Sequence, residues 1–254
     1  MPDASSAEAA RRAGVAGEAA PSRSGGLPLS APARAVMIAC GFIPLLHAFL
    51  SIAPAALVLG GVAGWRVLLL IPVLLYGLPP LVVGLAVRLR PIARGAFEPG
   101  SSAFLWWWFT AQWQVLFARL PLLEELLRLV PGLYSAWLRA WGARVGALVY
   151  WSPGVVMTDR PLVRIGDRVV VGFGVRLAAH AVAPARDGRQ RLHVAAIEIG
   201  SDAVVGGYSL VLPGCRVAAG EATPPLRTLH HFTTYAGGRR IRRGESAGLP
   251  EDRA

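Results

Sequence analysis

His180 is the side chain in the C-terminal half of the chain whose position best suits chemistry. It lies at the base of a polar stretch, residues 178–196, that interrupts a regular repeat. Loops that project from a repeat scaffold often carry binding chemistry. An imidazole with an unperturbed pKa of about 6.5 is mostly neutral near pH 7 and can accept a proton. Without further context, the favoured interpretation of His180 is a polar corner residue that donates to a nearby carbonyl.

A six-residue repeat surrounds this histidine and must position it. Aliphatic residues recur at every sixth position on both sides of the polar stretch, with small or turn-forming residues between them. They are Val145, Trp151 and Met157, then Ile165, Val171 and Leu177, and finally Ile199, Val205, Val211 and Val217. A helix would place apolar residues three and four apart, and a flat strand would alternate them. The spacing predicts a parallel β-helix with these residues inside, and it sends Ser209 and Arg216 outward or to a corner.

The segment from Thr158 to Arg242 resembles the hexapeptide-repeat acyltransferases, which are left-handed β-helix enzymes. The resemblance rests on Asp159, on IGDRVVVGFGVRLAAH ending at His180, on the polar loop, and on the returning repeat IEIGSDAVVGGYSLVLPG. The closing YAGGRRIRR departs from the family, which has Pro-Ala where this chain has Gly-Arg-Arg. Together with the apolar N-terminal half, the chain is also similar in architecture to the C-terminal region of poly-lysine-synthetase-type peptide synthetases.

The resemblance implies roles for several residues. His180 would be the general base that activates a hydroxyl or amine acceptor for attack on acyl-CoA, with acetyl-CoA the first donor to consider. Asp159 would bind the acceptor, although it also fits a turn residue that bonds its own backbone. His193 in the polar loop is a second candidate for the acceptor site, or simply an exposed loop residue. The family's active sites lie between subunits of a trimer, which predicts a homotrimer.

Contacts with coenzyme A are expected at two places. Gly206 and Gly207 would allow the pantetheine arm to approach the backbone closely because neither has a side chain. Guanidinium groups suit phosphates, which points to Arg239 and Arg240 with the neighbouring Arg242 and Arg243. The alternatives for this run are a solvated tail or contact with anionic lipid. No permanently bound cofactor and no metal site are expected, since His230 and His231 have no partners at ligand spacing.

The N-terminal half contains two long apolar segments. Residues 35–65 and 67–87 carry no charged side chain, and about 20 apolar residues suffice to cross a bilayer as a helix. We expect a transmembrane helical hairpin over residues 35–88 with a tight turn at Arg66. Arginines flank both outer ends, which places both ends in the cytoplasm. His47 is expected to be a satisfied polar residue between the two helices.

Residues 89–142 are expected to form interfacial amphipathic helices. The Trp-rich run 104–113 suits the headgroup level of a membrane, and a re-entrant or third spanning element starting at Ala103 is the alternative. Residues 121–141 place leucines on one stripe and the pair Glu124 and Arg128 on another. This segment would lie on the cytoplasmic face of the membrane.

Composition limits the remaining classes. The net charge is +11, and every Lys/Arg position is an arginine. No nucleic-acid-binding motif accompanies this charge. The two cysteines predict no disulfide framework. The fold class is therefore α + β: a disordered tail (1–34), the hairpin, the interfacial helices, a short left-handed β-helix (143–222) and a C-terminal basic segment (223–254).

The expected function is a membrane-associated acyltransferase of a bacterial inner membrane. The catalytic domain would be cytoplasmic and would act on a small-molecule or lipid-linked acceptor, with no nucleic-acid partner. Two alternatives differ in class. One is a non-catalytic, membrane-anchored β-helix that docks a partner enzyme, and the other is an accessory subunit of a transporter whose functional part is the hairpin.

Overall fold

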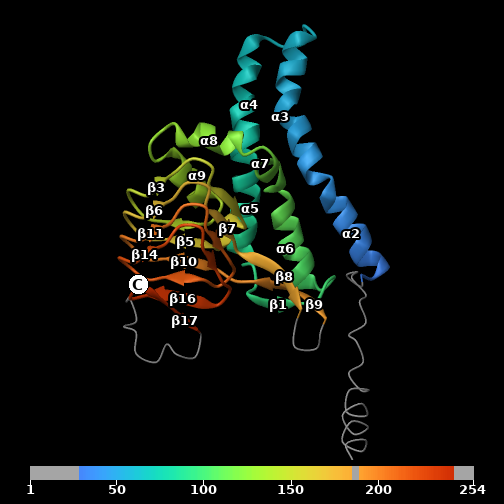
Figure 1. The fold of residues 1–254 in the computed structure, drawn as a ribbon. Helices are drawn as coiled ribbons and strands as arrows, with labels where there is room; N and C mark the ends of the chain where they lie inside the picture. The colour runs from blue at the N-terminus through green and yellow to red at the C-terminus, as the bar shows by residue number, and fades with distance from the viewer. Residues whose placement is uncertain (1–28, 185–188, 243–254) are drawn as a thin grey trace, which may run out of the picture.

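The fold consists of an apolar helical hairpin, a cluster of short helices and a stack of β-coils (Figure 1). It is seen in a computed structural model that describes residues 29–184 and 189–242. The expected disordered tail therefore lies largely outside the described residues, as does Arg243. The first helix begins at Ala31, inside the segment that we expected to be tail.

The helices and strands have the following bounds. The helices are α2 (Ala31–Gly41), α3 (Ile43–Leu59), α4 (Leu70–Pro72), α5 (Leu78–Leu89), α6 (Ser102–Gln112), α7 (Val115–Arg119), α8 (Leu122–Arg128) and α9 (Leu133–Ala140). A 3₁₀ segment (Trp65–Leu69) and a π-helical turn (Val73–Gly77) link α3, α4 and α5. The coil strands are β2 (Arg144–Val145), β3 (Tyr150–Trp151), β4 (Val156–Thr158), β5 (Val163–Ile165), β6 (Val170–Val171), β7 (Arg176–Ala178), β10 (Ile197–Ile199), β11 (Val204–Val205), β12 (Leu210–Val211), β13 (Arg216–Val217), β14 (Ala222–Thr223), β15 (Thr228–Leu229) and β16 (Thr233–Ala236). The others are β1 (Gly95–Phe97), β8 (His180–Pro184), β9 (Gln190–Val194) and β17 (Arg239–Arg242).

The coil strands pair in parallel to form three sheets, as the six-residue repeat predicts. The first sheet runs β2–β5–β10–β13–β16, the second β3–β6–β11–β14 and the third β4–β7–β12–β15. Each successive set of three strands is one triangular coil. Parallel pairing continues past residue 222, the expected end of the coils, to Tyr235 in β16. The antiparallel strand β17 then covers the last edge. Left-handed coiling stays a prediction.

The repeat residues stack on one another inside the coils. In register they form the columns Val145–Ile165–Ile199–Val217, Trp151–Val171–Val205–Thr223 and Met157–Leu177–Val211–Leu229. All are buried except Trp151, which is half-buried. The corners between strands are tight, and Leu148, Arg168, Asp202, Tyr208 and Leu226 take positive φ there. The predicted register is confirmed.

The burial of Ser209 was not predicted. Ser209 was expected to point outward or to lie at a corner, and at the corner before β12 it is only 1% exposed. Its hydroxyl lies 3.4 Å from the carbonyl of Pro224 and 3.3 Å from the amide of Arg227 in the next coil. A corner position is buried wherever another coil stacks on it, which a repeat pattern within one coil does not reveal.

The hairpin matches the two apolar segments. The helical stretches Ala31–Leu59 and Trp65–Leu89 are long and apolar enough to cross a membrane, and few of their residues are buried in the protein. The turn is Gly60–Gly64, so Arg66 already belongs to the second stretch rather than to the turn. His47 is buried, and its Nε2 lies 3.0 Å from the carbonyl of Leu75 across the hairpin, as expected for a polar residue between the two helices.

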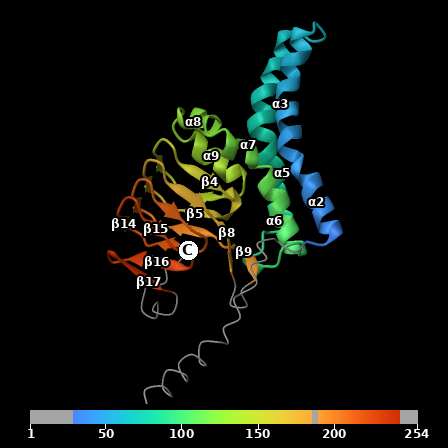
Figure 2. The ribbon, with the colours of Figure 1, turned by 45° about the vertical axis from the view of Figure 1, so that its right-hand side comes forward.

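The short helices connect the hairpin to the coils. Helix α6 runs beside α2, whereas α8 and α9 cover the first coil (Figures 1 and 2). A close approach joins α5 to α9, because a Cβ placed on Gly84 would lie 2.1 Å from the carbonyl oxygen of Ala140. The hairpin therefore packs directly against α9, which covers the first coil.

Candidate active site

The candidate site lies at the corner where the third sheet turns back to the first. Asp159 follows β4 at this corner in a left-handed conformation, and His180 follows β7 at the same corner one coil later. The register Thr158 to Ala178 places the two positions in neighbouring coils. Instead of entering the next coil, the chain leaves at His180 as the antiparallel hairpin β8–β9. The interruption of the repeat therefore begins at His180.

Asp159 and His180 form a close polar pair. Nδ1 of His180 lies 2.5 Å from Oδ2 of Asp159. If the carboxylate accepts this bond, Nδ1 carries the proton, and the neutral tautomer leaves Nε2 with a free lone pair. The side chain of His180 is 31% exposed, whereas that of Asp159 is 1% exposed. The imidazole of His180 is therefore accessible from solvent, while the carboxylate that bonds it is buried in the protein.

Trp107 of α6 completes this arrangement. Its Nε1–H donates to Oδ1 of Asp159 at 2.7 Å, and its ring centroid lies 4.7 Å from that of His180. Both oxygens of Asp159 are thus engaged. This geometry favours a carboxylate that orients the imidazole over the expected acceptor-binding role for Asp159. Trp107 was expected at the headgroup level of a membrane, but it is buried in the protein.

The surroundings set the protonation of His180 by two opposing effects. Burial lowers the pKa of the imidazole, because a charged ring loses hydration. The hydrogen bond and the negative charge of Asp159 raise it and outweigh the burial, so the pKa of His180 is raised overall. The imidazole therefore has a partner that stabilises the cation formed when the ring takes up a proton.

A buried ionic cluster lies directly behind the pair. Arg160 follows Asp159, is fully buried, and pairs with Glu124 of α8. Its amide and Nη1 both donate to Oε1 of Gln114, at 2.9 and 3.1 Å. The hydroxyl of Tyr134 donates to Glu124, and Arg128 lies 3.2 Å from the same carboxylate. The guanidinium of Arg160 is also 5.3–5.6 Å from the ring centroids of Phe117, Trp137 and Trp141. This cluster fixes the backbone on which Asp159 sits.

The remaining predicted residues lie at different places. His193 pairs with Ala181 in the β8–β9 hairpin, so the alternation of side chains puts it on the face opposite His180. Gly206 and Gly207 occupy the corner between the second and third sheets, away from the corner of His180. A Cβ on Gly206 would lie 2.5 Å from backbone atoms of Thr223, Pro224 and Pro225, so close stacking of coils already explains this glycine. The structure does not bring these three residues to the Asp159–His180 pair.

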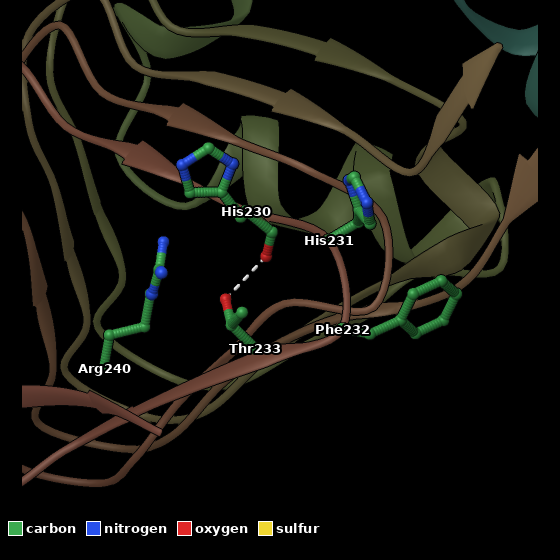
Figure 3. A pocket seen from close by; sticks show the side chains of 5 residues that line it. All are labelled: His230, His231, Phe232, Thr233 and Arg240. Atoms are coloured by element: carbon green, nitrogen blue, oxygen red, sulfur yellow. Dashed lines mark hydrogen bonds between the residues drawn. The ribbon is translucent and has the colours of Figure 1, made fainter. Parts of the chain in front are cut away.

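Arg239 and Arg240 lie on β17 beyond the last coil, and Arg240 joins a shallow pocket. The pocket is lined by His230, His231, Phe232, Thr233 and Arg240. Figure 3 shows His230 and Arg240 reaching toward the same opening, while Phe232 points away from it. His230 follows β15 at the corner used by Asp159 and His180. At about 4.8 Å per coil, the pocket begins roughly 10 Å along this edge from His180.

Sequence reasoning missed Trp107, Gln114, Glu124 and Arg160 as parts of the site. Trp107 is 52 residues from Asp159, and Glu124 is 36 residues from Arg160. Of these four residues, only Glu124 had a feature visible in the sequence, because it is an acidic residue in a leucine-rich segment. Within the described residues, no group of three His, Cys, Asp or Glu side chains could hold a metal ion.

Comparisons with known proteins give matches to solved structures only. No protein-family model and no curated protein matches the sequence. A hexapeptide-repeat-containing acetyltransferase from Vibrio cholerae O1 biovar eltor, complexed with acetyl coenzyme A, is 18% identical with a TM-score of 0.36, over 60% of this chain and 94% of that chain. A maltose O-acetyltransferase from Clostridium difficile 630 is 15% identical with a TM-score of 0.32, over 51% and 87% of the two chains. Soybean serine acetyltransferase is 18% identical with a TM-score of 0.23, over 70% and 78%. Because these TM-scores are low, a function for this chain has to be argued from its own site.

Proposed function

We propose that this protein is a membrane-associated acyltransferase with His180 as its general base. The donor is acyl-CoA, with acetyl-CoA the first to consider, and the acceptor is a hydroxyl or an amine. The Asp159–His180 pair is the observation that carries this proposal. A carboxylate bonded to Nδ1 leaves Nε2 as a proton acceptor in a side chain that is partly exposed, which is the arrangement that general-base catalysis requires.

The chemistry follows from that arrangement. Nε2 of His180 takes the proton of the acceptor hydroxyl or amine as its oxygen or nitrogen attacks the thioester carbon. The resulting imidazolium is stabilised by the charge of Asp159. When the tetrahedral intermediate collapses, the carbon–sulfur bond breaks and the thiolate of coenzyme A leaves. The imidazolium then supplies a proton to that thiolate, which restores the neutral base and leaves an ester or amide as product.

The donor has a path along the edge of the coils. We propose that the phosphates of acyl-CoA bind near Arg240 and His230 and that the acyl end reaches His180 along the same corner. Arg239 adds positive charge to β17. Contacts from Gly206 and Gly207 stay a prediction. In a homotrimer, the neighbouring subunit would cover this edge, as the family resemblance implies.

The location follows from the hairpin. We propose that α3 to α5 anchor the protein in a bacterial inner membrane and that the coils lie in the cytoplasm, where acyl-CoA is available. The exposed apolar surface of the two helical stretches supports this anchoring. The alternative of a non-catalytic scaffold offers no reason for a partly exposed histidine bonded to a buried carboxylate.

The test uses the purified full-length protein in lipid nanodiscs. With acetyl-CoA and a bacterial lipid extract, we expect release of the free thiol of coenzyme A together with a product that is heavier by one acetyl group, detected by mass spectrometry. Absence of thiol release above the protein-free control, with acetyl-CoA and with longer acyl-CoA donors, would exclude acyl transfer as the function.

A further inference from the structure

Helices α8 and α9 form a cap on the first coil. The contacts are polar and specific. Arg128 donates from Nη2 to the carbonyl of Val155 at 2.8 Å, and the amide of Gly154 donates to Oε1 of Glu125 at 2.8 Å. Trp151 donates from Nε1 to the hydroxyl of Ser135 at 2.9 Å. These bonds bind the inner face of the cap to the open end of the coil stack.

The polarity of this cap is the reverse of that expected in water. Two of its charged residues face the protein: Glu124 is 4% exposed, and the side chain of Arg128 is 6% exposed. Arg139, near the end of α9, is exposed but donates to the carbonyls of Val145 and Gly146 in the first coil. The outer face of the cap is apolar, with exposed fractions between 41% and 76%. The residues of this face are Leu122, Leu126, Leu129, Val130 and Leu133. We call these five residues the outer cap face.

An exposed apolar face of this kind is expected to be shielded from water by another surface. The terminal cap of a repeat stack must have a polar outer surface if it faces water. A contiguous apolar surface instead indicates contact with a partner or a membrane. Glu124 and Glu125, the two acids of α8, are turned toward Arg160 and Gly154, so neither opposes a negatively charged surface.

The position of the hairpin indicates what contacts the outer cap face. The part of the hairpin formed by α3 and α4 extends beyond the same end of the coil stack that the cap closes, and α8 lies beside the hairpin at that end (Figures 1 and 2). Tyr76 of the hairpin donates its hydroxyl proton to the carbonyl of Leu123 at 2.9 Å, which joins the two apolar surfaces. A bilayer that surrounds the hairpin would therefore meet the outer cap face as well.

We infer that the outer cap face rests on the lipid bilayer that surrounds the hairpin, so that the coils stand with their first coil toward the membrane. This rests on the proposed membrane association. It narrows the expected interfacial segment to α8 and α9, because α6 packs beside α2 with Phe104 and Trp107 buried. Asp159 and His180 lie on the first two coils, within about two coil spacings of the cap, or roughly 10 Å. The site then faces acceptors carried by membrane lipids rather than those free in the cytoplasm.

Site-specific fluorescence tests this orientation without using activity. In a Cys40→Ala background, a Leu126→Cys variant carries an environment-sensitive dye on the outer cap face. A matched Leu226→Cys variant carries it at the far end of the coils, where Leu226 is 78% exposed. Cys215 is buried and can stay. Both full-length proteins are reconstituted in vesicles of phosphatidylethanolamine and phosphatidylglycerol and quenched in turn by nitroxide-labelled lipid and by aqueous iodide.

The expected result is a blue-shifted dye at residue 126 that nitroxide lipid quenches and iodide does not, with the opposite response at residue 226. Iodide quenching at both positions would overturn the inference, because the cap would then face water. Lipid quenching at both would overturn the upright orientation. Shielding of residue 126 from both quenchers would assign the cap to a protein partner and would equally overturn it. None of these outcomes depends on whether His180 is a base.

Discussion

At the scale of single residues, the site is defined by how completely Asp159 is held. Trp107 and His180 bond its two oxygens, and Arg160, the next residue, is fixed by Gln114 and Glu124. A carboxylate with this many fixed neighbours cannot turn toward a substrate without breaking them. It can hold one tautomer of His180 and stabilise the charge that develops on that ring.

Replacing Asp159 by Asn should lower the pH at which the enzyme becomes active while reducing its maximal rate. Asp159 raises the pKa of His180, so its loss leaves burial as the main effect and lowers that pKa. The base works in its neutral form, and activity of the wild type should rise as pH rises through the raised pKa. The measurement is the pH dependence of kcat/KM. An unchanged acidic limb in the variant would contradict the pairing.

The sequence pointed to His180 and Asp159 but not to the residues that support them. The histidine was found because it stands where the repeat breaks, and the aspartate because of a family resemblance. Trp107 lacked any comparable signal, since one indole in a Trp-rich run cannot be told apart from its neighbours. Its role depends on how α6 packs against a coil that begins more than thirty residues later.

At the scale of elements, the coils could be predicted well because a single period governs them. Each repeat residue stacks on its counterpart in the next coil. The spacing in the sequence therefore predicts which residues are in contact. The helices between residues 102 and 140 could be predicted only in outline. Their leucine stripe and their Glu124–Arg128 stripe were visible, but which stripe faces the protein is decided by the buried Arg160.

The stacking predicts a sharp contrast between a substitution inside the coils and one on their outer surface. Val205→Asp should place an unpaired carboxylate in the fully buried coil interior and destabilise the protein by several kcal/mol, on the order of 3–5. Arg216→Asp, on the outer side of β13, should be mild by comparison, although it removes the ion pair with Glu198. Thermal melting and resistance to protease are the measurements. Equal effects of the two substitutions would show that the register is wrong.

The ionic cluster between the cap and the coils gives a second contrast. Arg160→Met should cost about 3–5 kcal/mol of stability, because it leaves Glu124 charged, buried and without its main partner. Combining it with Glu124→Gln should recover part of that loss. The exposed pair Arg168–Asp202 serves as the control, and Arg168→Met should change the melting temperature little. A double variant no more stable than Arg160→Met alone would contradict the proposed pairing.

At the scale of the whole molecule, the hairpin and the coils form one packed unit. Gly84 brings α5 against α9, and Trp137 of α9 donates its indole N–H to the carbonyl of Tyr76 at 2.8 Å. The coils therefore cannot move freely relative to the hairpin. The two apolar segments were readable from composition alone, whereas this docking was not, because a glycine and an indole in apolar helices have many possible partners.

The topology of the chain should place both ends on the cytoplasmic side. Reporter fusions after residue 30 and after residue 254 should report the cytoplasm, because arginines follow and precede the two apolar stretches. A tag inserted at Gly61, in the turn of the hairpin, should be reachable from outside. A periplasmic C-terminal reporter would remove acyl-CoA from the reach of the site and would contradict the proposed mechanism.

The most direct measurement is the rate of acyl transfer by His180→Gln in the full-length protein. Glutamine keeps a polar side chain beside Asp159 but cannot act as a base, so the rate should fall by roughly 100-fold or more with melting temperature and membrane insertion preserved. Arg168→Gln, on a different corner of the coils, should keep the wild-type rate. A His180→Gln enzyme that transfers acyl groups at close to the wild-type rate would contradict the account.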